Sequence, residues 1–272
     1  MAAALSSRVV VLLRASHPAP AFAVTAVTAL LAVATGHNLA SGLLVTAAVA
    51  AGQLSIGWSN DLIDATRDRK VGRPDKPIAR DEISVGLVQR AVAVALFLCV
   101  VLSLACGLAA AGVHLVLGVG SGWAYNLYFK RTLWSALPYA VAFGTLPAVV
   151  TLALPDPEWP APWTFLAGAL LGVGAHLLNA LPDLTDDAST GVHALPHRLG
   201  EERVRVLAPL VLLAASCVVV FGPGTPDTPA PWVALGACVV LAVLSVASPG
   251  RTPFLAAIGI ALLDVVSLVL RG

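Results

Sequence analysis

Long apolar runs separated by short polar segments dominate the chain. Runs of roughly 18 or more apolar residues predict transmembrane helices, because about 20 helical residues span the hydrocarbon core of a bilayer. Backbone polar groups must pair within the segment in lipid, so each run is expected to be helical. Nine runs qualify, at about 19–37, 39–59, 86–108, 110–128, 134–153, 163–182, 203–221, 230–248 and 253–270. The pattern predicts an all-α, polytopic membrane protein with nine transmembrane helices in one bundle.

Composition agrees with a lipid-embedded chain. Hydrophobic residues make up 58% of the 272 residues and charged residues 11%, whereas soluble domains carry about 25% charged residues. The formal net charge of +1 indicates no charged partner, and nucleic acid is not expected. The four cysteines lie inside the apolar runs and are interpreted as small buried residues. The sequence gives no indication of the oligomeric state.

Basic residues lie on one side of the predicted bundle. Lys and Arg favour cytoplasmic loops. With the N-terminus inside, all of them face inside except Arg271, and the opposite loops contain neither. The predicted location is the inner or plasma membrane, with a cytoplasmic N-terminus.

We expect a single membrane-embedded domain over 1–272. Residues 1–18 are interpreted as an N-terminal interfacial segment, with a disordered tail as the alternative. The polar segments 60–85 and 183–202 are expected to be cytoplasmic cap loops. They lie four predicted helices apart, which suggests a parallel repeat of two four-helix units followed by a ninth helix.

An acidic cluster follows the second apolar run, in SNDLIDATRD. If that helix continues, Asp61, Asp64 and Asp68 lie at i, i+3 and i+7 and share one face, beside Asn60. Clustered carboxylates repel one another unless a cation is present. Hard oxygen ligands suit Mg²⁺, which also binds phosphate oxygens.

A second acidic cluster, in NALPDLTDD, follows the sixth run. Asp183 and Asp187 lie at i and i+4, Asp186 is adjacent, and Asn179 and His176 precede them by one and two turns. Either cluster alone could be a solvated acidic loop. Together, at the same end of their helices in a membrane chain, they favour a functional site on the cytoplasmic side.

A basic run, RDRKVGRPDKPIAR, follows the first cluster and contains Arg67, Arg73 and Lys76. In part it is a positive-inside loop. Arg can also bind phosphate through two hydrogen bonds, and Lys through a point charge. Tyr125 and Lys130 end the fourth run on the same side.

These motifs resemble those of the UbiA family of membrane prenyltransferases. NDLIDATRD (60–68) matches that family's NDxxDxxxD signature, and GRPDKPIARDEIS (72–84) resembles its R-P-x-x-P continuation. DLTDD (183–187) is similar to its second, DxxxD-type motif, and YNLYFKR (125–131) to its Tyr-to-Lys segment. The resemblance covers the whole chain in span count and motif order.

The resemblance implies a helical bundle around a central cavity that is open to lipid. It also implies an enzyme that transfers an isoprenoid chain from a prenyl diphosphate to a small-molecule acceptor, often the aromatic precursor of a quinone. Mg²⁺ is the implied cofactor. The implied ligands of Mg²⁺ and diphosphate are Asn60, Asp61, Asp64, Asp68, Asp183 and Asp187, and Arg67, Arg73, Lys76, Tyr125 and Lys130 are implied diphosphate contacts.

One departure concerns the second motif. His193 stands where many members of the family carry Lys or Arg, which leaves the grip on the diphosphate and the choice of acceptor open. His176 is interpreted as a packing residue, or alternatively as an acceptor ligand or base. Asp264, inside the ninth run, is expected to hydrogen-bond a neighbouring helix.

Two other reactions remain open at this stage. A membrane terpene cyclase would use the same ionisation residues, and transfer to a non-aromatic acceptor would use them too. A transporter is disfavoured, because the acidic residues cluster at one membrane face rather than at the midplane. Prenyl length, acceptor identity and the proton-accepting base cannot be inferred from the residues.

Overall fold

A computed structural model describes residues 2–73 (side chains from Arg8), 75–181, 184, 194–248, 250 and 252–270. The regular elements in these ranges are all helical. They are α1 (Ala2–Arg14), α2 (Pro18–Ala34), α3 (Leu39–Val71), α4 (Val85–Ala105), α5 (Leu108–Gly112), the π-helix η1 (Val113–Val119), α6 (Gly120–Leu127), the 3₁₀ turn η2 (Phe129–Arg131), α7 (Leu137–Thr151), α8 (Pro162–Ala180), α10 (Leu195–Leu199), α11 (Glu201–Phe221), α12 (Pro229–Ala247) and α13 (Thr252–Val269).

Seven of these helical segments are long and apolar enough to cross a membrane. An eighth results if α1 and α2, which meet at an angle of 77°, are taken together as one span. Helix α7 is apolar but has 15 residues, which is short for a span. The prediction of a polytopic all-α membrane bundle is confirmed with seven to eight candidate spans. The count of nine and the orientation in the membrane stay predictions.

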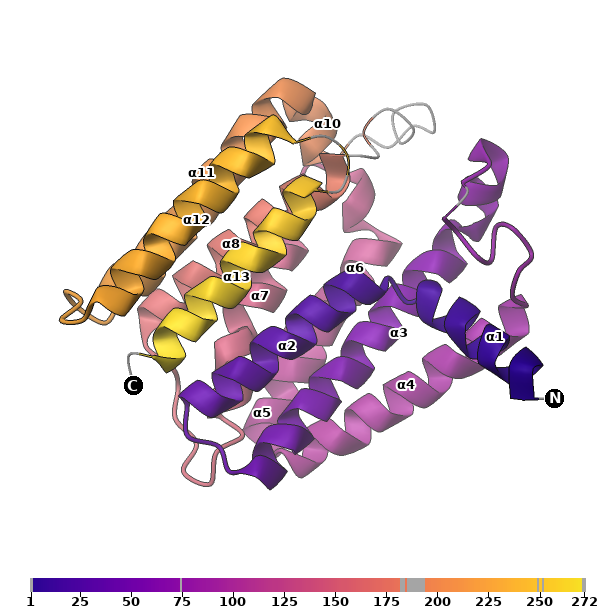
Figure 1. Cartoon of the computed structure of the whole chain (residues 1–272). Coiled ribbons are helices and arrows are strands. Elements are labelled where there is room, and N and C mark those ends of the chain that lie inside the picture. Colours follow the sequence, from indigo (N-terminus) through magenta and orange to yellow (C-terminus); the bar gives the residue numbers. More distant parts are fainter. Residues whose placement is uncertain are drawn as a thin grey trace.

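The helices form a ring in chain order (Figure 1). Each long helix packs on its neighbour in sequence, from α2 to α4, through α5, η1 and α6 to α7, and on through α8, α11 and α12 to α13. Helix α13 then closes the ring against α2, and also contacts α8. This arrangement leaves a space at the centre that α2, α3, α6, α7, α8 and α13 surround.

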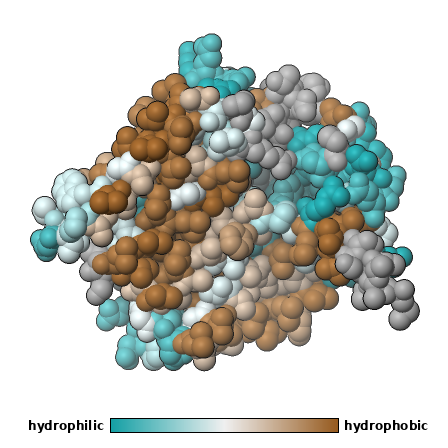
Figure 2. Space-filling view, in the orientation of Figure 1, coloured by the Kyte–Doolittle hydropathy of each residue, from teal (hydrophilic) through white to brown (hydrophobic). Residues whose placement is uncertain are grey.

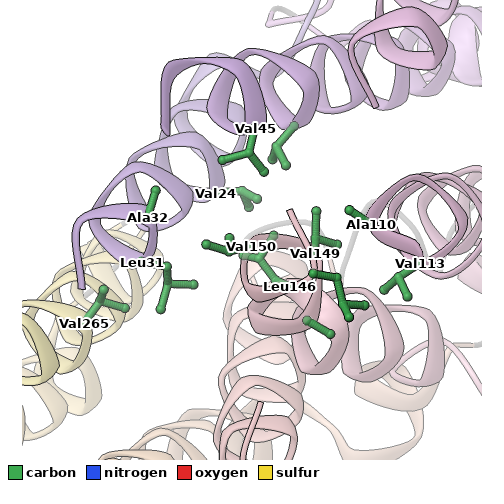
Figure 3. Close-up of a cluster of buried hydrophobic side chains, with 13 residues drawn as sticks. Val24, Leu31, Ala32, Val45, Ala110, Val113, Leu146, Val149, Val150 and Val265 are labelled. Carbon is green, nitrogen blue, oxygen red and sulfur yellow. The ribbon is translucent and has the colours of Figure 1, made fainter. Parts of the chain in front are cut away.

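A buried aliphatic cluster joins opposite sides of the ring (Figure 3). Leu31 on α2, Val45 on α3, Val149 on α7 and Val265 on α13 are all buried members of it. Outward-facing side chains are hydrophobic too. Figure 2 shows brown surface over α11, α12 and α13, whereas teal surface gathers at upper right, where α3 ends. The outer face is therefore suited to lipid contact.

Two segments differ from the sequence-based expectation. The stretch 60–85 was expected to be a loop, but its first part is helical, because α3 continues to Val71 and ends at Gly72 with a left-handed φ of 68°. The run 110–128 was expected to be one helix, but the π-helix η1 interrupts it. Residues 2–14 form a helix and not a disordered tail.

Candidate active site

A cavity of about 610 Å³ lies at the centre of the ring. Its deep part is apolar, with Val49 from α3 and Leu146 and Val149 from α7. Its other end is polar and carries the residues of the first acidic motif and of the loop that follows it. The cavity therefore joins an apolar compartment to a highly charged mouth.

The acidic residues of α3 share one buried face. Asp61, Asp64 and Asp68 are 1%, 3% and 1% exposed. The helix extends over 33 residues, about 50 Å at 1.5 Å per residue, so a rigid segment and not a loop carries these carboxylates. The i, i+3, i+7 relation expected from the sequence is therefore realised. Asp61 and Asp64 line the cavity.

Two basic residues pair with these carboxylates. Lys130 comes from η2, which follows α6, and Arg67 comes from α3 itself. The Lys130 Nζ donates to Asp64 Oδ1. The Arg67 guanidinium lies 3.3 Å from Asp64 Oδ2 and 3.4 Å from Asp68 Oδ1. Lys130 is buried, which lowers the pKa of its ammonium, and the neighbouring Asp64 charge opposes that effect. Sequence separation of 66 residues between Lys130 and Asp64 makes this pair a product of the fold.

Lys76, from the loop after α3, approaches the same face. Its Nζ lies 3.3 Å from Asp61 Oδ1 and 3.9 Å from Asp68 Oδ2. It also donates to Asn60 Oδ1 at 3.4 Å and lies 2.9 Å from His17 Nε2. Lys76 is 6% exposed, so the loop that carries it is folded down onto the helix.

Arg73 lines the cavity one turn before Lys76 and is held by Asp75. Arg73 Nε donates to Asp75 Oδ1 at 3.1 Å. Burial tends to raise the pKa of the Asp75 carboxyl, but the hydrogen bonds and charge of Arg73 outweigh it and lower that pKa to about 2. At neutral pH the Asp75 carboxylate is therefore ionised, and its ion pair with Arg73 holds this part of the loop.

Aromatic and amide groups form the wall opposite α3. The Tyr125 ring makes edge contacts with Tyr139 at 5.0 Å and with His176 at 5.6 Å between centroids. Tyr139 shares hydrogen bonds with Tyr125 and Asn179. Tyr125, Tyr139 and Asn179 line the cavity. The site therefore combines acidic, basic and aromatic groups around one opening.

Comparison with known proteins assigns this arrangement to a family. The family model described as "UbiA prenyltransferase family" matches residues 21–253, which is most of the chain. The chain belongs to the UbiA prenyltransferase family. It is accordingly a prenyltransferase enzyme, an integral membrane protein that acts on prenyl diphosphates with Mg²⁺. No curated protein sequence gives a significant match.

Solved structures of the family share the fold. A UbiA homologue from Aeropyrum pernix K1 aligns with a TM-score of 0.74 at 15% identity, over 92% of this chain and 97% of that one. A homologue from Archaeoglobus fulgidus bound to DMAPP and Mg²⁺ aligns at 0.69 and 17%, over 95% and 98%. A digeranylgeranylglyceryl phosphate synthase aligns at 0.64 and 16%, over 97% and 98%. At sequence identities this low, the similarity to these structures establishes the fold alone.

The acidic face offers carboxylate oxygens, the kind of donor that Mg²⁺ binds. Both carboxylate oxygens of Asp61 and Oδ2 of Asp68 are buried and lack a well-aligned hydrogen bond, with the Lys76 ammonium 3.3 Å from Asp61 Oδ1 and 3.9 Å from Asp68 Oδ2. Oxygen atoms left in this way suit a hard cation. Among the described side chains, no group of three His, Cys, Asp or Glu is arranged as a metal site. Lys76 lies between Asp61 and Asp68, and Arg67 lies between Asp64 and Asp68.

The predicted second motif cannot be placed. Asp183, Asp186, Asp187 and His193 lie outside the described residues. Of the other predicted residues, all line the cavity except Asp68 and His176. Asp68 lies behind the lining, in contact with Arg67 and Lys76. His176 lies behind Tyr125 and Tyr139. His176 is 1% exposed and its Nε2 lies 3.0 Å from Ser135 Oγ; its role stays a prediction.

Sequence reasoning missed several polar residues that line the cavity. His17, Gln53, Asn126 and Tyr139 are among them. Asn126 accepts from Asn60 Nδ2 at 3.0 Å and donates to Ser59 and to the carbonyl of Ile56. A signal existed for Asn126, which adjoins Tyr125 in the Tyr-to-Lys segment. Nothing local to the sequence distinguishes His17 or Tyr139.

Proposed function

We propose that this enzyme transfers a prenyl chain to an aromatic, quinone-precursor-like acceptor inside the membrane. One observation carries the proposal. The buried carboxylate of Asp61 lies 3.3 Å from the Lys76 ammonium, at the mouth of a 610 Å³ cavity with an apolar interior. A metal-bound diphosphate matches the charged mouth, and an isoprenoid tail matches the interior.

The basic residues receive the diphosphate. Lys76, Lys130 and Arg67 are paired with carboxylates of the acidic face. Asp61, Asp64 and Asp68 would hold Mg²⁺, and the three basic side chains would then be available to phosphate oxygens. Arg73 contacts the diphosphate from the loop. Asp183 and Asp187 complete the metal site from the other half of the chain, as in the family resemblance, with Asp186 adjacent.

The reaction begins with heterolysis of the C1–O bond of the donor. The electron pair leaves with the diphosphate, where Lys130 and Arg67 stabilise the growing negative charge. Mg²⁺, when bound by the acidic face, supplies Lewis-acid withdrawal of charge from the same oxygens. An acceptor carbon forms the new bond to C1, and the proton of that carbon passes to an oxygen of the released diphosphate, which completes the transfer. Tyr125 and Tyr139 line the cavity near this point.

The apolar wall has a chemical role as well as a binding role. Water that reached the allylic cation would convert it to an alcohol, so the dry interior protects the intermediate. The site faces the cytoplasm in this proposal, because the basic residues around it follow the positive-inside pattern. The isoprenoid tail then occupies the apolar interior, and the diphosphate stays at the charged mouth on the cytoplasmic side.

A non-aromatic acceptor is the second candidate. The fold resembles that of a digeranylgeranylglyceryl phosphate synthase, whose name specifies a glyceryl phosphate product. Cyclisation of the donor on its own double bonds would use the same ionisation residues. The three outcomes differ in which nucleophile captures C1, which product analysis identifies directly.

The test is a diphosphate-release assay on the purified protein in detergent. Geranyl, farnesyl and geranylgeranyl diphosphates are supplied with Mg²⁺ or EDTA, first without acceptor and then with aromatic acids or geranylgeranylglyceryl phosphate. Release that requires both Mg²⁺ and an aromatic acid supports the proposal. A requirement for the glyceryl phosphate overturns the aromatic assignment. A cyclic hydrocarbon without acceptor identifies a cyclase.

Asp64→Asn tests the role of the acidic face. Its carboxylate contacts Lys130 and Arg67, and its loss should lower the rate of diphosphate release by about 10²–10³-fold, as for removal of one transition-state electrostatic partner. Asp81→Asn is the matched control, because Asp81 is 83% exposed and pairs with Arg69 outside the cavity. Equal rates for the two variants would contradict the assignment of Asp64.

A further inference from the structure

A sharp elbow, residues 15–17, connects α1 to α2 beside the charged mouth of the cavity. The two helices meet at 77°. His17 has a φ of 54°, in the left-handed region that non-glycine residues rarely adopt. Ser16 and His17 line the cavity, and so does Arg14. The elbow precedes residue 21, where the match to the family begins, so its role cannot be inferred from the family motifs.

Independent contacts clamp this elbow onto the catalytic helix. Ser16 lies so close to α3 that a Cβ atom added to Gly57 would come within 1.9 Å of its carbonyl oxygen. Trp58 Nε1 donates to the carbonyl of Leu12 at 2.8 Å. Arg14 pairs with Glu82 at 2.9 Å, in the same loop that carries Lys76. The elbow is therefore fixed both to α3 and to the Lys76 loop.

The His17 side chain reaches the ammonium of Lys76, with 2.9 Å between Nε2 and Nζ. An ammonium group donates hydrogen bonds and cannot accept them, so Nε2 of His17 is the acceptor. The ring is then neutral with its proton on Nδ1. The Lys76 ammonium thus contacts three acceptors, which are Asp61 Oδ1, Asn60 Oδ1 and His17 Nε2.

We propose that His17 is a positioning residue for the diphosphate site. It holds the Lys76 ammonium toward the cavity, so that Lys76 is poised to bind a phosphate oxygen. Without His17, the remaining attractions come from Asp61 at 3.3 Å, Asn60 at 3.4 Å and Asp68 at 3.9 Å. Lys76 would then settle among the carboxylates and compete with Mg²⁺. The N-terminal elbow thereby becomes part of the active site. This inference rests on the proposed function, in which Lys76 contacts the diphosphate.

The probe is geranyl S-thiolodiphosphate, a donor analogue, whose binding is measured by calorimetry on the full chain in detergent over a range of Mg²⁺ concentrations. His17→Phe should weaken binding by about tenfold, equivalent to about 1.4 kcal/mol. It should also shift the Mg²⁺ concentration for half-maximal binding upward. Absence of Mg²⁺-dependent binding by the unchanged protein would count against the proposed function itself. Normal binding and Mg²⁺ dependence in folded His17→Phe would overturn the role of His17.

Two conservative variants keep the test decisive if the Phe variant does not fold. Gln at position 17 places its amide oxygen near the site of Nε2, whereas Asn is too short to reach Lys76 but tolerates the left-handed backbone better. A positioning role predicts that His17→Gln binds the analogue more tightly than His17→Asn. A role limited to backbone conformation predicts the opposite order, and either that order or equality overturns the proposal.

A second histidine provides the control. His37 bonds Ser41 and the carbonyl of Val150, between α2 and α3 and outside the cavity lining. His37→Phe removes a comparable pair of hydrogen bonds. It should leave the affinity for the analogue and the Mg²⁺ requirement unchanged. An equal loss of affinity in this variant would show that the His17→Phe effect reports general damage to the bundle, and would overturn the assignment to His17.

Discussion

At the scale of single residues, buried carboxylates serve two different purposes in this chain. Asp61 and Asp64 are buried at the mouth of the cavity, in contact with basic side chains. Asp264 is equally buried, at 1% exposure, but it does not line the cavity. Its Oδ2 accepts from Ser216 at 3.0 Å and its Oδ1 lies 3.6 Å from the Cys238 sulfur. The predicted hydrogen bond from α13 to a neighbouring helix is confirmed.

Asp264 should therefore matter for stability and not for catalysis. Asp264→Ala removes the carboxylate acceptor of Ser216, which keeps its longer bond to the Leu212 carbonyl, and breaks the link between α13 and α11. A loss of about 1–3 kcal/mol in the free energy of unfolding is expected. Asp264→Asn, which can still accept, should lose less. The measurement is the melting temperature in detergent, together with diphosphate release per folded molecule. A fall of more than tenfold in the rate at unchanged melting temperature would assign Asp264 a role in the reaction.

At the scale of elements, the length of α3 and the spacing of α7 and α8 shape the site. Helix α3 runs 33 residues, about 50 Å, whereas the hydrocarbon core is about 30 Å thick. One continuous helix therefore carries both membrane-crossing residues and the acidic motif.

Helices α7 and α8 approach closely because α8 presents Gly168 and Gly172 to the backbone of α7.

Because α7 packs closely on α8, we expect a side chain at Gly172, between these helices, to be tolerated less well than one at a glycine that faces open space. A Cβ at Gly172 would lie 2.4 Å from the carbonyl oxygen of Tyr139, which is backbone and cannot rotate away. Gly172→Val should separate the helices and lower the free energy of unfolding by about 1–3 kcal/mol. Because Tyr139 lines the cavity, affinity for the donor should fall as well.

Gly236 on α12 is the control for this prediction. A Cβ there would meet nothing within 4 Å. Gly236→Ala should be neutral or raise stability by up to about 1 kcal/mol, because Ala favours helix over Gly. Melting temperatures of both variants in the same detergent test the pair. If both variants lost the same stability, contact between α7 and α8 would not be the reason why a larger side chain at position 172 is destabilising.

At the scale of the whole molecule, the ring closure by α13 encloses a cavity whose volume limits the donor. Ala142 on α7 lines its apolar part. Ala142→Phe fills part of the 610 Å³, so geranylgeranyl diphosphate should lose more of its kcat/KM than geranyl diphosphate. We expect the ratio of the two to change by about 10-fold or more, the range found for one or two methylene-sized mismatches in an apolar pocket.

Ala93 on α4 is the control for cavity filling. It is exposed on the outside of the bundle and does not line the cavity. Ala93→Phe places the same ring against lipid or detergent, so both donors should react as with the unchanged protein. Equal change for long and short donors in Ala142→Phe would indicate that the isoprenoid tail lies elsewhere.

The sequence by itself determined the membrane character, the helical class, the family and the shared face of Asp61, Asp64 and Asp68. These features depend on composition and on periodicity within a few turns, which a sequence displays directly. The count of spans was less secure, because α2 and α7 are short and α1 is bent away from α2. Hydropathy does not reveal bends or the exact ends of helices.

Tertiary structure decided which groups meet at the mouth of the cavity. Lys130 reaches Asp64 across 66 residues, and His17 reaches Lys76 across 59. Tyr139 enters the site from α7, whose inward face the sequence does not mark. Such contacts follow from how α3, α6, α7 and the elbow pack together, and no local pattern encodes the distance between two side chains on different helices.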